Sequence, residues 1–219
     1  MIIKFEKKFK NFKIGLIGTR KKILSSVMMA KEIEFVELES YDEIDSTYDI
    51  IFGSGMYSII ENEIIKKPKY GCIFFHETPL PEGRGSAPIQ WTVLNKKDNL
   101  CITALKVNEF MDAGDYLYQH NIQIEELDTL RILEKKREIG IQECFNIILD
   151  ELLDGYMVLR KQSGKTTYSL KRTPEDSEID RRQTLEYLWD QIRICDNDKC
   201  PAFFRLDGKK VYLRYEVEE

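Results

Sequence analysis

The sequence predicts an α/β protein with a doubly wound, mainly parallel sheet and a small C-terminal α+β appendage. Three observations predict this fold. Short apolar runs alternate with helical segments over the first half of the chain. The run 70–75 is almost wholly apolar, as in a strand that is covered on both faces. Asp207-Gly208 separates two strand-like runs near the end of the chain, which indicates a hairpin.

The elements follow in order along the chain. The first half is expected to form strands 12–18, 32–38, 48–52 and 70–75, with helices 20–31 and 61–67 between them. Two prolines and two glycines in residues 76–85 exclude a helix and a central strand, so this segment is a loop. The second half is expected to form helix 87–94, strand 101–107, loop 108–115, strand 116–124, a helical segment from 128 to about 162, helix 182–195, and strands 202–206 and 210–216. Gly140 and Gly155 weaken the long helical segment, so the alternative is a kink or an early end.

Length and composition limit the classes of protein. With 219 residues, we expect a main domain over 1–163 and a small subdomain over 164–219 that holds a helix and the hairpin. The net charge of −5 argues against a large nucleic-acid surface, and no apolar run is long enough to span a membrane. Five cysteines without a Cys-x-x-Cys motif, beside only two histidines, favour a reduced cytoplasmic protein without a metal site.

His76 is the best candidate for a functional residue, because it stands where an apolar strand ends and a Pro/Gly loop begins. Ligands of open α/β sheets bind at the carboxyl ends of strands. Asp112 follows strand 101–107; if the two strands are neighbours, both side chains face one crevice and form a His–carboxylate pair. The alternatives are a histidine satisfied by the loop backbone and, for Asp112 or the nearby Asp115, an ordinary turn residue.

Three ordered motifs carry a resemblance to a known family. They are His76-Glu-Thr-Pro-Leu-Pro-Glu-Gly-Arg-Gly-Ser-Ala-Pro-Ile-Gln-Trp91, Cys-Ile-Thr103 and Met111-Asp-Ala-Gly-Asp115. They resemble the core of the formyltetrahydrofolate-dependent formyltransferases, most of all the nucleotide-sugar N-formyltransferases. The segment Lys171-Arg-Thr-Pro-Glu-Asp-Ser-Glu-Ile-Asp180 is similar to the one that follows the catalytic domain in methionyl-tRNA and sugar enzymes. The resemblance covers most of 12–215, is strongest over 70–118, and implies the family's Rossmann-like fold.

The resemblance implies transfer of a formyl group from the co-substrate N10-formyltetrahydrofolate to an amine, with His76 and Asp112 as catalytic residues. A short tail and an acidic chain disfavour methionyl-tRNA as acceptor. The preferred acceptor is a nucleotide-linked amino sugar of the UDP- or dTDP-4-amino-4,6-dideoxyhexose type, used in surface or flagellar glycan synthesis. A homodimer is one possible assembly. The alternatives are formyltetrahydrofolate hydrolysis, formylation of another amine, and a non-catalytic folate- or nucleotide-binding protein.

The family's other binding positions fall on two sets of residues. The implied folate site consists of Met56, Tyr57, Ser58, Leu80, Pro81, Asn108 and Phe110. The implied acceptor site consists of Gly18, Thr19, Arg20, Phe74, Glu77 and Arg172. The turn at 18–20 could hold a phosphate at a helix N-terminus, and its alternative is a solvated basic turn. For Met56, Tyr57 and Phe110 the alternative is core packing.

Phe74 departs from the family pattern, which has asparagine at this position, two residues before the catalytic histidine. A phenyl ring cannot donate a hydrogen bond to the oxyanion that develops on the formyl group. Loss of one such donor typically costs about 2.7–4 kcal/mol. A backbone N–H or His76 replaces it, or the acceptor approaches differently, or activity is reduced.

Overall fold

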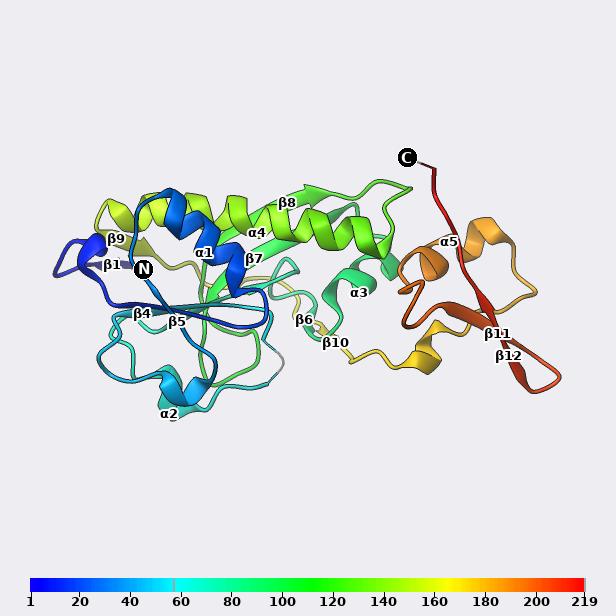
Figure 1. Cartoon of the computed structure of the whole chain (residues 1–219), viewed down its shortest axis with the longest axis horizontal. Helices are drawn as coiled ribbons and strands as arrows, with labels where there is room; N and C mark the ends of the chain where they lie inside the picture. The colour runs from blue at the N-terminus through cyan, green and yellow to red at the C-terminus, as the bar shows by residue number, and fades with distance from the viewer. Residues whose placement is uncertain (57, 219) are drawn as a thin grey trace.

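The computed structural model describes residues 1–56 and 58–218. A six-stranded sheet forms its centre, in the order β3-β2-β4-β5-β7-β8 (Figure 1). The strands are β2 (Ile14–Ile17), β3 (Val36–Glu37), β4 (Ile50–Ser54), β5 (Cys72–His76), β7 (Asn99–Lys106) and β8 (Tyr116–Gln123). The first four are parallel, and β7 runs antiparallel to both of its neighbours. The predicted fold class, α/β with a mainly parallel sheet, is confirmed.

Helices cover both faces of this sheet, because its strands are apolar on both sides. Helices α1 (Lys21–Ala30) and α4 (Leu130–Leu153) lie on one face, and the short α2 (Asn62–Ile65) lies on the other (Figure 1). The α4 side chain Phe145 packs edge-on against Phe52 and Phe75, with ring centroids 4.9 and 5.7 Å away. A separate apolar cluster under α2 includes Ile51, Ile64 and Cys72.

Helix α4 ends at Leu153, so the prediction of a helix reaching about 162 is wrong, and the alternative of an early end at Gly155 is confirmed. Gly155 takes a left-handed conformation (φ 92°) after the helix, and the chain then extends. Residues Tyr156–Val158 form β9, which pairs antiparallel with the unpredicted strand β1 (Ile2–Lys4). The side chain of Met157 is buried in the main apolar cluster. The predicted strand 32–38 is also shorter in the structure, with only Val36–Glu37 paired.

The segment after β9 crosses back over the main domain. Its strand β10 (Tyr168–Ser169) pairs in parallel with β6 (Arg84–Gly85), and β6 is followed by α3 (Pro88–Leu94). The C-terminal part then forms 3-10 helix η3 (Pro174–Ser177), helix α5 (Leu185–Arg193) and the hairpin β11 (Ala202–Leu206) and β12 (Lys209–Leu213). Two further 3-10 helices, η1 and η2, span Phe9–Asn11 and Tyr41–Glu43.

The predicted hairpin is confirmed, and its turn residues Asp207 and Gly208 both have positive φ (48° and 76°), as a two-residue type I′ turn requires. The buried Arg193 of α5 fastens this part of the chain to the main domain, where it donates to the carbonyl oxygens of Glu125 and Asp128. The boundary at 163/164 stays a prediction. Among the described residues, no helix is both long and apolar enough to cross a membrane.

Candidate active site

A cleft of about 630 Å³ opens at the carboxyl ends of β2, β4 and β5. The strand order reverses between β2 and β4 at this edge, which is the usual ligand-binding position in open α/β sheets. The cleft lies between the turn after β2, the loop after β4, the loop 107–112 and the first turns of α3 and α4, with Lys171 and Arg172 on its border.

His76 is the last residue of β5, and its side chain is 10% exposed in the cleft. Its Nε2 lies 2.9 Å from the carbonyl oxygen of Gly83. A carbonyl oxygen can only accept a hydrogen bond, so Nε2 carries a hydrogen in both protonation states of the ring. The lone pair of the neutral ring is therefore on Nδ1, which is the atom that can gain and lose a proton.

Asp112 faces that atom. Its Oδ2 lies 3.7 Å from His76 Nδ1 and accepts a hydrogen bond from the Gly85 N–H at 2.8 Å. The first distance is too long for a hydrogen bond but is within the range of an ion pair. The carboxylate, 23% exposed, can stabilise the imidazolium that forms when Nδ1 takes a proton.

The route that brings the pair together differs from the one expected. Strands β5 and β7 are neighbours, but they are antiparallel: His76 pairs with Thr103, and Lys106 pairs with Ile73. Strand β7 therefore ends near the start of β5, and the loop after it must return along β5 to place Asp112 beside His76. Gly114 allows this return, since a Cβ there would lie 1.7 Å from the Lys106 carbonyl oxygen.

The implied folate residues fall into two groups. Met56, Ser58, Asn108 and Phe110 line the cleft, where Phe110 is 65% exposed. Leu80 and Pro81 are buried and lie outside the described lining of the cleft, and the Leu80 carbonyl accepts a hydrogen bond from Gln119 Nε2 at 3.0 Å. Tyr57 lies outside the described residues.

The implied acceptor residues also divide. Arg20, Phe74, Glu77 and Arg172 line the cleft. Gly18 and Thr19 lie outside its described lining, because this turn packs against the end of β4: a Cβ on Gly18 would be 2.1 Å from the Ser54 carbonyl oxygen. The Thr19 and Arg20 N–H groups donate to the carbonyl oxygens of Gly55 and Ser54, so they are not open to a phosphate.

Charged side chains gather on the α4 side of the cleft. Arg20 reaches the buried Glu77 with its side chain, at 2.7 Å. Arg137 of α4 lines the same wall; burial lowers the pKa of its guanidinium, and the positive charge of Arg20 lowers it further. Lys171 and Arg172 add two further cations.

Phe74 lies on the same strand face as His76, two residues earlier, as strand geometry requires. Its ring stands over Gly53 of the neighbouring strand, where an added Cβ would meet the ring carbon Cε1 at 2.5 Å. The ring thus fills a space that only a glycine partner leaves open.

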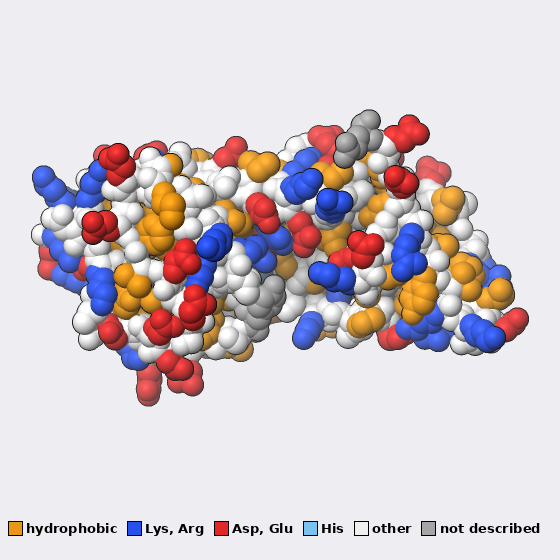
Figure 2. Space-filling model, viewed as in Figure 1, with side chains coloured by type: hydrophobic (Ala, Val, Ile, Leu, Met, Phe, Trp, Pro, Cys, Tyr) orange, Lys and Arg blue, Asp and Glu red, His pale blue; other side chains and the backbone are white. Residues whose placement is uncertain are grey.

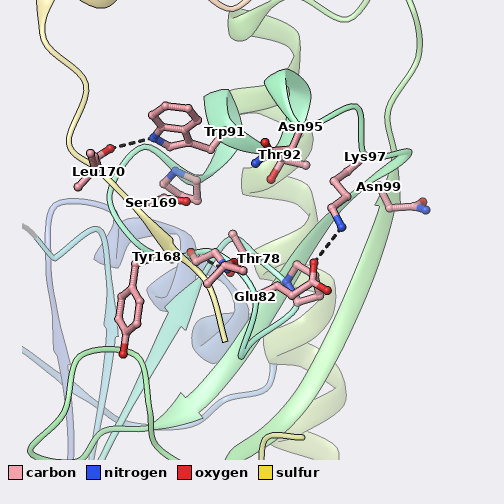
Figure 3. A pocket seen from close by; sticks show the side chains of 14 residues that line it. Thr78, Glu82, Trp91, Thr92, Asn95, Lys97, Asn99, Tyr168, Ser169 and Leu170 are labelled. Atoms are coloured by element: carbon pink, nitrogen blue, oxygen red, sulfur yellow. Dashed lines mark hydrogen bonds and ion pairs between the residues drawn. The ribbon is translucent and has the colours of Figure 1, made fainter. Parts of the chain in front are cut away.

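A second cavity, of about 570 Å³, is lined by residues of the 78–83 loop, α3 and β10 (Figure 3). Trp91 closes one wall and donates from Nε1 to the Leu170 carbonyl oxygen at 2.8 Å, and Lys97 is paired with Glu82 at 2.8 Å (Figure 3). Neither His76 nor Asp112 is among its described lining residues, so the first cleft is the candidate active site.

The described residues contain neither a candidate metal site nor a thiol that is activated as a nucleophile. They contain no group of three or more side chains that could hold a metal ion. Burial raises the pKa of the Cys72 thiol to about 12 and that of Cys101 to about 11, so both are protonated at neutral pH.

The sequence model of the formyl transferase family matches residues 20–142 of this chain. This range contains β5, His76, the following loop and Asp112. The chain belongs to this formyl transferase family. Members of the family use formyltetrahydrofolate as the formyl donor, as the resemblance implied.

Relatives in the formyl transferase family differ in acceptor. A methionyl-tRNA formyltransferase of Thermodesulfovibrio yellowstonii is 29% identical over 161 residues, which are 74% of this chain and 52% of that protein. The chain thus spans about half the length of the curated relatives it matches. A 4-N formyltransferase of Francisella tularensis has a similar fold (TM-score 0.76, 19% identity, 95% and 98% of the two chains). So does PseJ of Anoxybacillus kamchatkensis, solved with UDP-4,6-dideoxy-4-formamido-L-AltNAc and tetrahydrofolate (TM-score 0.62, 24% identity, 72% and 85%).

Two residues near this formyl transferase site were missed by sequence reasoning. Arg137 stands in the charged run 134–138 of α4, which is indistinguishable from a solvated helix face in the sequence. Gln162 contacts the backbone of Asp112 from a segment that was predicted as the end of a helix. No periodicity marks a single polar side chain in a linker, so the sequence held no signal for it.

Proposed function

We propose that the chain transfers a formyl group from N10-formyltetrahydrofolate to the amine of a nucleotide-linked amino sugar, of the UDP- or dTDP-4-amino-4,6-dideoxyhexose type, in surface or flagellar glycan synthesis. The observation that carries this proposal is the arrangement within one cleft. The His76–Asp112 pair shares the cleft with exposed apolar side chains such as Phe110 and with the guanidinium groups of Arg20 and Arg172.

The apolar rim suits the donor. Met56, Ile59, Phe110 and Met111 line one side of the cleft, and Ile59 and Phe110 are 77% and 65% exposed. Exposed apolar groups at a cleft are typical of a surface that a flat ring system covers. When bound there, the folate supplies the formyl group, and we assign Ser58 and Asn108 to its polar edge.

His76 and Asp112 handle the proton. The acceptor amine must lose a proton as it attacks the formyl carbon. Nδ1 of His76 takes that proton, while the Gly83 carbonyl holds Nε2–H in place and the Asp112 carboxylate stabilises the imidazolium. The proton then passes to N10 of the folate as the bond between N10 and the formyl carbon breaks, so that tetrahydrofolate leaves and His76 is neutral again. Phe74 offers no hydrogen bond, so we assign it to shaping the acceptor pocket.

The cationic wall suits an acceptor that carries phosphates. Guanidinium groups bind phosphate oxygens with charge-assisted, often paired hydrogen bonds. Arg20 is held by Glu77 at 2.7 Å, and Arg172 lies over the Trp91 ring, 5.7 Å from its centroid. Both side chains are thus preorganised beside the catalytic pair.

Methionyl-tRNA is the competing acceptor, because the curated relative named above is a methionyl-tRNA formyltransferase. Transfer RNA binding requires a basic surface that neutralises many phosphates. The chain has a net charge of −5, and acidic and basic side chains are interspersed over the face shown in Figure 2. This distribution supports the smaller acceptor.

Steady-state assays with formyltetrahydrofolate test the proposal. The purified protein is mixed with a UDP-linked amino sugar, its dTDP-linked counterpart, methionyl-tRNA, or no acceptor. We expect formamide product with at least one nucleotide sugar and donor loss that depends on it. Donor loss without acceptor would indicate a hydrolase, formylation of methionyl-tRNA alone would indicate the competing function, and donor binding without turnover would indicate a binding protein.

A matched pair of variants locates the acceptor. Arg172→Gln should raise the KM for the nucleotide sugar roughly tenfold, the value of one charged contact, and leave the KM for the donor unchanged. The exposed Arg181, which lies outside the described lining of the cleft, supplies the control Arg181→Gln. Equal effects of the two variants would contradict a phosphate contact at Arg172.

A further inference from the structure

The relative position of His76 and Asp112 is not fixed by a contact between their own side chains. The 3.7 Å between Nδ1 and Oδ2 leaves the two side chains without a direct hydrogen bond. Asp112 also has a left-handed backbone (φ 50°), which costs a residue other than glycine about 1 kcal/mol or more. Other contacts must therefore fix the position of its carboxylate.

Gln162 supplies contacts of this kind. It lies between β9 and β10, and its Nε2 donates to the carbonyl oxygens of Asp112 and Gly114, each at 2.8 Å. These two hydrogen bonds span the left-handed turn at Asp112 and so hold it closed.

The same side chain also holds the loop that carries the partners of the pair. Gln162 Oε1 accepts from Arg84 at 2.6 Å. Arg84 stands between Gly83, whose carbonyl faces His76 Nε2, and Gly85, whose N–H donates to Asp112. Arginine can only donate and the two carbonyls can only accept, so the amide fits in one orientation alone.

We propose that Gln162 is a positioning residue that sets the distance between His76 and Asp112. It acts through the backbone of Asp112 and through Arg84, and it lies outside the described lining of the cleft. The kinetic test of this inference rests on the proposed function, because it needs an assay of formyl transfer. The NMR test of the His76 ring needs the structure alone.

Gln162→Met keeps the size of the side chain and removes all three hydrogen bonds. Because a displacement of about 1 Å in a catalytic group can cost roughly a hundredfold in rate, we expect kcat to fall by about 10- to 100-fold. Both KM values should stay within about twofold, as expected for an interaction that affects only the transition state. Gln162→Glu retains the acceptor for Arg84 but sets negative charge against two carbonyl oxygens, so it should not rescue the rate.

Gln119→Met is the matched control. Gln119 Nε2 also makes two hydrogen bonds, to the Leu80 carbonyl and to Thr103 Oγ1, at 3.0 and 3.1 Å. Neither bond involves Asp112. This variant should lower the melting temperature about as much as Gln162→Met. Because Thr103 pairs with His76, the control discriminates by direction: Gln119→Met should not move the His76 ring signals in the direction of Asp112→Asn.

Two measurements decide the inference. The chain has only two histidines, so NMR of isotopically labelled histidine resolves the His76 and His120 rings separately. Gln162→Met should move the His76 ring signals in the same direction as Asp112→Asn and leave those of His120, which is paired with Glu143, in place. In kinetics, Asp112→Asn with Gln162→Met should be no slower than Asp112→Asn alone.

Unmoved His76 signals in Gln162→Met, in a fold where Asp112→Asn moves them, would overturn the inference. So would rate losses that multiply in the double variant. If the wild-type protein formylates no nucleotide sugar, the proposed function fails, while the NMR comparison still decides the role of Gln162.

Discussion

Replacing Asp112 with asparagine removes a charge and little else. Asparagine has the same size, tolerates the left-handed backbone at this position, and can still accept the hydrogen bond from the Gly85 N–H. The turn should therefore persist. The lost element is the negative charge 3.7 Å from His76 Nδ1.

The distance sets the size of the effect. A unit charge at this separation from the imidazolium is worth about 4 kcal/mol at an effective dielectric constant of about 20. Asp112 is 23% exposed, and water screens part of this interaction. A loss of about 2–4 kcal/mol remains, which corresponds to a reduction of kcat by roughly 30- to 1000-fold.

Steady-state formyl transfer measures the effect, with the melting temperature as a control for folding. The matched control is Asp115→Asn, since Asp115 lies three residues away and outside the described lining of the cleft. We expect Asp115→Asn to keep most of the wild-type rate. An active Asp112→Asn beside an inactive Asp115→Asn would refute the assignment of the carboxylate.

Three more variants test the account. His76→Asn should lower kcat at least about a hundredfold with an unchanged melting temperature, because acid–base groups contribute about 10²–10⁴-fold; near-normal turnover would remove His76 from the reaction. Phe74→Asn should lower the free energy of unfolding by about 1–4 kcal/mol, through the void it leaves, and raise the KM for the acceptor while the KM for the donor stays unchanged; calorimetry and rate assays check both, and an unchanged acceptor KM would contradict the pocket-shaping role. Burial would raise the pKa of Asp190, but hydrogen bonds from Lys96 and Arg193 hold this pKa below its ordinary value. The Asp190 carboxylate therefore stabilises the fold at a pH above its unfolded-state pKa. This stabilisation is lost as the pH falls through the lower folded-state pKa. Asp190→Asn should therefore cost about 1–3 kcal/mol in urea unfolding at neutral pH, and a difference that persists at about pH 2 would contradict this linkage.

The fold could be predicted to a large extent because strand and turn signals are local. The apolar run of β5 and the Asp207-Gly208 turn predicted their elements correctly. Gly155 marked a point at which α4 could end, but the strand that follows it could not be predicted in the same way. The continuation of α4, Tyr156–Val158, becomes a strand only because β1 from the other end of the chain pairs with it.

The sequence predicted that His76 and Asp112 share one cleft, which the structure shows, but not the geometry that brings them together. His76 follows from its place at the end of an apolar strand, and Asp112 from the resemblance. The sequence does not show that β7 is antiparallel to β5, so it could not reveal the return of the 107–115 loop. Nor could the sequence show that the carbonyl oxygens of Ser54 and Gly55 accept hydrogen bonds from the N–H groups of the 18–20 turn, since these contacts join distant segments.

Formyl transfer to a defined amine tests the central claim most directly. The protein is incubated with isotopically labelled formyltetrahydrofolate and a mixture of a UDP-linked 4-amino-4,6-dideoxyhexose, its dTDP-linked counterpart and methionyl-tRNA, and mass spectrometry locates the label. We expect the labelled formamide on a nucleotide sugar, formed at least about a hundredfold more slowly when His76→Asn replaces the wild-type protein. Label on methionyl-tRNA alone, or only in free formate, would contradict the account.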